Sequence, residues 1–91
     1  MGTWKVELDK AAERDLDKLD PQATRRIERF LYERVAALDD LRLLGEALHG
    51  SKLGELWRYR VGDYRIVCKI EDKTLRVLVI RIGHRREIYK R

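Results

Sequence analysis

The chain has 91 residues, of which 44% are hydrophobic and 41% charged, with one proline, one cysteine and a net charge of +5 at pH 7. This length allows a single domain (residues 1–91) with one two-layer core, and the composition excludes a disordered chain. One cysteine excludes an internal disulfide framework, and no apolar run reaches the roughly 18 residues of a membrane span. Without a secretory signal at the N-terminus, these features predict a cytoplasmic protein with no membrane association.

The first half of the chain reads as a strand followed by two helices. Residues 3–8 alternate apolar and polar side chains, which predicts a strand. Asp9 is an N-cap residue for a helix expected over residues 10–19. The Asp-Pro step at 20–21 marks the start of a second helix, expected to run to about residue 38. Because the break between them is short, the two helices are expected to form a hairpin.

Residues 39–54 form the least regular stretch, because glycine recurs there at positions 45, 50 and 54. We expect this stretch to be a connection without regular structure. Its three leucines, Leu43, Leu44 and Leu48, are expected to pack against the core.

The remaining residues predict three strands and a short tail. Residues 56–61 and 64–70 alternate in character around a Gly-Asp step, which is a strong hairpin signal. Residues 75–82 are apolar on both faces, which predicts a central strand covered on both sides. The expected fold is therefore α+β with the order β-α-α-β-β-β: a small, mainly antiparallel sheet with an N-terminal helical hairpin packed on one face. Cys68 lies in an apolar strand and is interpreted as a packing residue.

Arginines recur in the predicted hairpin at positions that normally carry neutral residues. A two-residue loop pairs Val61 with Tyr64, which puts Arg60 directly opposite Arg65 and Arg58 on the same face. Like charges that face each other across two strands are destabilising. A chain that keeps this arrangement is expected to use it to bind an anion.

The distribution of charge supports the same interpretation. Residues 1–46 carry 9 Lys or Arg against 11 Asp or Glu, whereas residues 47–91 carry 12 against 5. This asymmetry favours a polyanionic partner for the second half, with nucleic acid as the first candidate. The alternative is a solvated basic face, or a face whose arginines pair with acidic residues of the helices.

No metal site is expected, because the two histidines lack ligand spacing and no Cys/His cluster exists. A glycine-rich phosphate loop and a catalytic triad are also missing. Any chemistry would therefore need no metal or cofactor and would use Arg, Tyr and His. Tyr89 can relay a proton, stack on a base or simply pack, and His84 and His49 can equally be ordinary surface residues.

The sequence LWRYRVGDYRIVCKIEDKTLRVLVIRIGHRREIY (residues 56–89) resembles the RelE branch of the RelE/ParE toxins of bacterial type II toxin–antitoxin systems. The matching features are a strand with basic residues at alternate positions, the turn with Asp63-Tyr64-Arg65, an apolar strand, and the ending Gly-His-Arg-Arg-Glu-Ile-Tyr. The resemblance extends over the whole chain in the order of its elements.

This resemblance implies a ribosome-dependent mRNA endonuclease that cuts the message in the decoding site and so inhibits translation. The implied reaction is attack by the ribose 2′-hydroxyl on the adjacent phosphate, without metal. Arg65 matches the arginine that contacts the scissile phosphate, and Arg85 the arginine that stabilises the transition state or assists the leaving group. Tyr89 matches the tyrosine that orients the nucleotide and takes part in proton transfer.

The general base is not determined by the resemblance. Arg58 and Arg60 occupy positions where the best-known member has lysines, and an arginine effectively cannot lose its proton. His84 is the one nearby group with a suitable pKa. Further RNA or phosphate contacts are expected from Arg86, His49 and Lys52.

The same resemblance implies a cognate antitoxin as partner, RelB-like, encoded beside the toxin and partly acidic. Two such pairs can join through the antitoxin into a heterotetramer. Two other functions stay open. One is a ParE-like toxin that inhibits DNA gyrase and cuts no RNA, and the other is a plain nucleic-acid-binding module.

Overall fold

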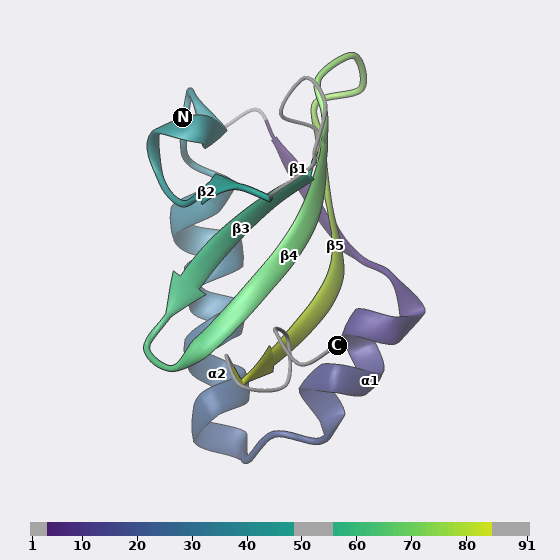
Figure 1. Cartoon of the computed structure of the whole chain (residues 1–91), viewed down its shortest axis with the longest axis vertical. Coiled ribbons are helices and arrows are strands. Elements are labelled where there is room, and N and C mark those ends of the chain that lie inside the picture. The colour runs from purple at the N-terminus through teal and green to yellow at the C-terminus, as the bar shows by residue number, and fades with distance from the viewer. Residues whose placement is uncertain (1–3, 49–55, 85–91) are drawn as a thin grey trace.

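The computed structural model describes residues 4–48 and 56–84 and consists of one five-stranded sheet with helices against one face (Figure 1). The elements, in chain order, are β1 (Lys5–Leu8), α1 (Lys10–Asp17), α2 (Pro21–Arg29), the π-helical segment η1 (Phe30–Val35), the 3₁₀ turn η2 (Leu41–Leu43), β2 (Glu46–Ala47), β3 (Leu56–Val61), β4 (Tyr64–Glu71) and β5 (Arg76–His84). The α+β class and the order of the predicted elements are confirmed, with β2 as an addition.

The helix starts follow the predicted capping. The Asp9 carboxylate accepts from the backbone N–H of Lys10 at 2.7 Å, and Asp20 accepts from that of Ala23 at 2.8 Å. Pro21 occupies the first turn of α2, where its missing N–H costs no hydrogen bond.

The predicted helix ends are less accurate. Helix α1 ends at Asp17 and not at residue 19. The second helix is α-helical only to Arg29 and continues as a π-helix to Val35, short of residue 38. In this segment the Ala36 N–H bonds to the Leu31 carbonyl, five residues back, which is the π-helical pattern.

The sheet order is β1-β5-β4-β3-β2, with β1 parallel to β5 and the other neighbours antiparallel. The predicted hairpin register is confirmed: Val61 pairs with Tyr64, and Arg60 with Arg65. Gly62 has a φ of +59°, as a two-residue turn with glycine at its first central position requires. A register shift between β4 and β5 leaves Ile80 as an extra residue of β5.

The core lies between the helices and one face of the sheet. Its largest side chains are Tyr59, Ile27, Leu31, Leu41, Ile66, Ile70 and Ile82. Cys68 is fully buried, which confirms its role in packing.

Strand β5 is central, since it lies between β1 and β4, but the expectation that both its faces are covered is wrong for the described residues. Val77 and Val79 are buried against the helices, whereas Leu78 and Ile80 on the other face stay partly exposed.

The described part of the connection, residues 39–48, is more ordered than its glycines predicted. Leu43, expected in the core, is 74% exposed, and Leu41 is buried instead, with its carbonyl bonded to the Tyr59 hydroxyl at 2.7 Å. The next residues form β2 beside β3. Gly45 precedes β2 with a φ of +75°, and a Cβ there would lie 2.3 Å from the Arg58 carbonyl oxygen, so this close approach requires glycine.

Candidate functional site

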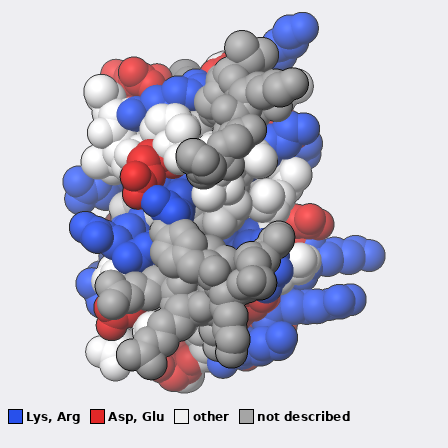
Figure 2. All heavy atoms as spheres, viewed as in Figure 1, with Lys and Arg blue, Asp and Glu red and all other residues white. Residues whose placement is uncertain are grey.

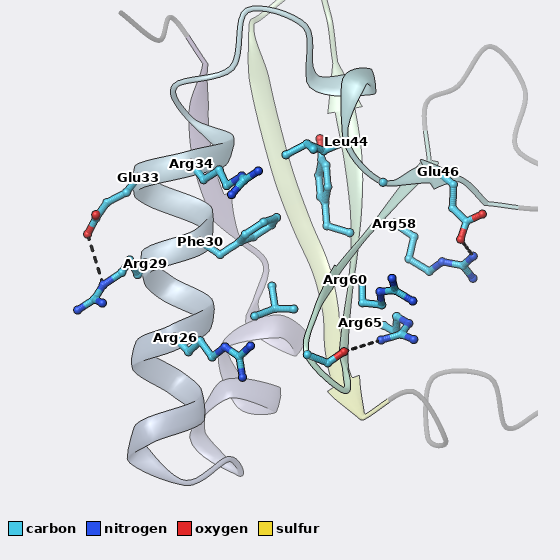
Figure 3. Close-up of a pocket in the computed structure, with 14 residues that line it drawn as sticks. Arg26, Arg29, Phe30, Glu33, Arg34, Leu44, Glu46, Arg58, Arg60 and Arg65 are labelled. Atoms are coloured by element: carbon cyan, nitrogen blue, oxygen red, sulfur yellow. Dashed lines mark hydrogen bonds and ion pairs between the residues drawn. The ribbon is translucent and has the colours of Figure 1, made fainter.

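An open groove of about 1050 Å³ separates α2 and η1 from β3 (Figure 3). Two sets of side chains, each with at least two arginines, line it. We call Arg58, Arg60 and Arg65 the strand wall, and Arg26, Phe30 and Arg34 the helix wall. The other lining residues are Arg29, Glu33, Leu44, Gly45, Glu46, Tyr59, Val61 and Gly62.

The strand wall brings together three residues that the sequence predicted as a cluster. Arg60 is exposed and stands directly opposite Arg65. Arg65 is only 8% exposed, and its Nη1 donates to the carbonyl oxygens of Gly62 at 3.2 Å and Tyr64 at 3.1 Å. Among the described residues, neither arginine has an acidic partner at ion-pairing distance. A guanidinium that is buried, fixed by backbone carbonyls and not neutralised is suited to hold an anion.

Arg58 differs from the other two. It forms an ion pair with Glu46 of β2. This partner was not predicted, because β2 was not predicted and brings Glu46 opposite Arg58 in register.

The helix wall was missed by the sequence reasoning. Arg26, Phe30 and Arg34 are spaced by four residues, which places them on one face of the helix, and Figure 3 shows both arginines reaching toward β3. This spacing was the available signal, but a charged helix face is usually solvated. Arg29, by contrast, points away from the groove and lies 3.9 Å from Glu33 in an exposed ion pair.

The electrostatics of the groove are strongly positive, because six of its lining residues are arginines and two are glutamates. Figure 2 shows basic side chains on the side of the molecule where β3 and α2 lie in Figure 1, and others on the opposite side. Guanidinium groups remain charged at any physiological pH and donate in a fork that matches phosphate or carboxylate. The groove is therefore suited to bind an anion with several charges.

His84 does not line the groove. It ends β5, one strand away from Arg65, and its ring packs edge-on against Tyr64 with the ring centroids 6.0 Å apart. The remaining predicted site residues, His49, Lys52, Arg85, Arg86 and Tyr89, lie outside the described residues.

Two other reactive side chains of the hairpin are unsuited to chemistry at neutral pH. Burial raises the pKa of the Cys68 thiol to about 12 and also raises the pKa of the Tyr59 hydroxyl well above its usual value. Both side chains therefore stay protonated.

Within residues 4–48 and 56–84, no three His, Cys, Asp or Glu side chains converge in a metal-binding arrangement. Every helix in the same ranges is too short or too polar to span a bilayer.

Comparison with known proteins identifies relatives over nearly the whole chain. Residues 6–89 match the family model described as the ParE toxin of the type II toxin–antitoxin system parDE. Toxin RelG of Mycobacterium tuberculosis is 31% identical over 88 residues, covering 97% of this chain and 98% of that protein.

Solved structures give the same picture. The toxin–antitoxin complex RelBE2 of M. tuberculosis contains a chain that matches with a TM-score of 0.79 and 29% identity, over 93% of this chain and 94% of that one. The RelB–RelE complex of Methanococcus jannaschii matches with a TM-score of 0.70 and 25% identity, over 91% and 94%. The isolated Escherichia coli RelE toxin, at 22% identity, has a TM-score of 0.72 over 94% and 90% and supports the fold alone.

Proposed function

The chain belongs to the RelE/ParE family of type II toxins, and from this premise we propose that it is a ribosome-dependent, metal-independent mRNA endonuclease that inhibits translation. The observation that carries the proposal is the strand wall, where the buried Arg65, which has no acidic partner among the described residues, lies opposite Arg60 in the lining of a basic groove. Binding alone would not need a buried guanidinium fixed by two backbone carbonyls. Stabilising a transition state does, because preorganised charge requires no rearrangement during the reaction.

The proposed reaction is an internal phosphoryl transfer. The 2′-oxygen of a ribose forms a bond to the adjacent phosphorus while the bond from phosphorus to the 5′-oxygen of the next nucleotide breaks. The 2′-hydroxyl proton passes to a general base, and the departing 5′-oxygen receives a proton. The products are a 2′,3′-cyclic phosphate and a 5′-hydroxyl. The ribosome supplies the substrate geometry for in-line attack.

Roles are proposed for the individual residues. Arg65 and Arg60 stabilise the negative charge on the phosphate, and Arg58 binds the RNA backbone when the phosphate displaces Glu46. Arg85 assists the leaving oxygen and Tyr89 orients the nucleotide. His84, which ends β5 opposite Tyr64, is the proposed general base.

A cognate antitoxin is the proposed partner. The related chains of RelBE2 and of the archaeal RelB–RelE pair were solved in complex with RelB-type antitoxins. An acidic segment of such a partner laid over the groove would neutralise the arginines and block RNA. Two toxin–antitoxin pairs joined through the antitoxin are the proposed assembly, and the substrate implies action in the cytoplasm.

Inhibition of DNA gyrase is the second candidate function, because the matching family model is described as a ParE toxin. A gyrase inhibitor needs no preorganised phosphate site. It therefore predicts that the Arg65 guanidinium is dispensable for toxicity.

The two functions are separated by one experiment in a reconstituted translation system. Primer extension on ribosome-bound message should reveal cuts within codons by the wild-type protein, with cyclic-phosphate ends, and far fewer cuts by Arg65→Met in the same reaction time. The matched control Arg25→Gln, an exposed arginine of α2 outside the groove, should cut normally. Intact message together with inhibited supercoiling by purified gyrase would instead establish the second function.

A further inference from the structure

We propose that the helix wall is a second phosphate-binding subsite, in which Arg26 and Arg34 hold single-stranded RNA next to the nucleotide at Arg65. This inference rests on the proposed function, because it takes the scissile phosphate to lie at the strand wall. It extends the RNA-binding surface to a helix that carries none of the RNA contacts predicted from the sequence.

The helix wall is open and charged. Arg26 and Arg34 are both exposed, and among the described residues neither has an acidic partner at ion-pairing distance. This contrasts with Arg29 on the same helix, which pairs with Glu33 and points away. Two guanidinium groups on one helix face that have no acidic partner among the described residues attract an anion.

The route between the two walls is not blocked by another strand. Strand β2 pairs only with Trp57 and Arg58, so in the part of the chain that the structure describes residues 59–61 of β3 have no partner on their outer side. Gly62 continues this open edge at the turn. Arg26 Nη1 lies 3.1 Å from the position of a Cβ at Gly62, and Arg65 bonds to the Gly62 carbonyl. Arg26 and Arg65 therefore reach the same residue, and one strand of RNA crossing the turn can meet both.

The chemistry of the wall favours RNA over a peptide. Phe30 lies between the two arginines and is partly exposed, and its ring is held edge-on to Tyr59 with the centroids 5.8 Å apart. A fixed aromatic ring flanked by cations is the pattern of single-stranded nucleic-acid sites, where a base stacks and the phosphates contact arginine. A peptide helix would need a row of apolar pockets, whereas most of this lining is charged or polar.

The test compares two double variants that lose the same charge. Arg26→Gln/Arg34→Gln changes the helix wall, and Arg14→Gln/Arg25→Gln changes exposed arginines outside the groove. The probe is a single-stranded oligoribonucleotide of about ten nucleotides with 2′-O-methyl groups, which can bind but cannot be cut. The plot of log affinity against log salt concentration should be shallower for the helix-wall variant by about 1.4, or about 0.7 for each phosphate that is no longer neutralised. The control should keep the wild-type slope.

A second measurement locates the subsite on the RNA. Each phosphate of the probe is replaced in turn by a neutral methylphosphonate. A methylphosphonate at one position beside the nucleotide bound at Arg65 should weaken binding to the wild-type protein. The same replacement should not weaken binding to the Arg26→Gln variant, because the neutral phosphate and the lost arginine each remove the same interaction. Independent effects at every position would contradict the subsite.

The outcomes separate this inference from the proposed function. If the wild-type protein cuts message and the helix-wall variant binds the probe with an unchanged slope, the subsite is wrong and the nuclease stands. If the wild-type protein cuts nothing but the slope differs as predicted, the subsite stands and the nuclease is wrong. If the helix-wall variant keeps its RNA affinity and loses affinity only for the antitoxin, the wall binds protein and the inference is overturned.

Discussion

Replacing Arg60 by glutamine is expected to stabilise the protein, although Arg60 belongs to the proposed active groove. Arg60 is exposed, forms no ion pair with the described residues and stands directly opposite Arg65. Arg60→Gln keeps the length and polarity of the side chain and removes one of two facing positive charges. A residue kept for its interaction with RNA can be unfavourable for the folded state.

The size of the gain follows from the pairing. Two unit charges about 6 Å apart in a water-like medium repel by about 0.7 kcal/mol, within the range for facing charges on two strands. The screening length is about 10 Å at 0.1 M salt and about 3 Å at 1 M. The free energy of unfolding should therefore rise by about 0.4 kcal/mol at 0.1 M salt and by about 0.1 kcal/mol at 1 M.

Urea unfolding at both salt concentrations measures this difference. With a slope of about 1 kcal/mol per molar urea, the midpoint of Arg60→Gln should lie about 0.4 M above that of the wild type at low salt. Arg25→Gln removes the same charge elsewhere on the surface and corrects for the effect of net charge. In an Arg65→Met background, Arg60→Gln should give no gain, because the facing charge is already gone.

Two results would refute this reasoning. A lower midpoint for Arg60→Gln would mean that Arg60 makes a favourable contact in the folded protein. A gain that persists in the Arg65→Met background would mean that the two guanidinium groups do not interact.

Three further predictions concern contacts that stabilise the fold. Asp15 accepts hydrogen bonds from Arg81 and from the backbone N–H of Ile82, the latter at 2.8 Å. In urea titrations, Asp15→Ala should therefore lower the free energy of unfolding by about 2 kcal/mol, and Asp15→Asn by less than about 1 kcal/mol. Equal losses for the two variants would contradict the hydrogen bond to the backbone. Gly62→Ala, at a φ of +59°, should cost about 1 kcal/mol in thermal unfolding, and an unchanged midpoint would show that the turn relaxes. Hydrogen bonding from Arg76 lowers the pKa of Glu71 below its usual 4.5, so the ionised Glu71 stabilises the folded protein. This stabilisation is complete above the pKa of Glu71 in the unfolded chain and is lost as the pH falls through the lower pKa of the folded protein. The melting temperature of Arg76→Gln should therefore decrease less than that of the wild type as the pH is lowered. An equal decrease would contradict the effect of Arg76 on the pKa of Glu71.

The fold was predictable where local chemistry decides it. The Asp9 and Asp20 caps and the register of the hairpin depend on neighbouring residues, and all three appear in the structure as expected. A two-residue turn with glycine at its first position fixes which residues face each other, so the opposition of Arg60 and Arg65 followed from the turn alone.

The rest of the site depends on contacts between distant residues. Alternation assigns Arg65 to a face of the hairpin but cannot show that its guanidinium folds back onto the turn, or that the residue as a whole is only 8% exposed. The pairing of Arg58 with Glu46 exists only because a two-residue strand forms in a glycine-containing connection, where sequence preference for strands is weak. The helix wall could not be predicted, because the sequence does not show which face of α2 lies toward β3.

The rate of cleavage of ribosome-bound message by Arg65→Met tests the central claim most directly. The variant should unfold at a denaturant concentration close to that of the wild type, so that any loss of rate reflects the site and not the fold. With ribosomes in excess, a single-turnover measurement should show cleavage slower by a factor of about 10² to 10³, which is the usual effect of removing one preorganised charge stabiliser. Arg65→Lys keeps the positive charge but loses the forked donor geometry of the guanidinium, so its cleavage rate should lie between those of the wild type and Arg65→Met. Cleavage by folded Arg65→Met at the wild-type rate would contradict the account.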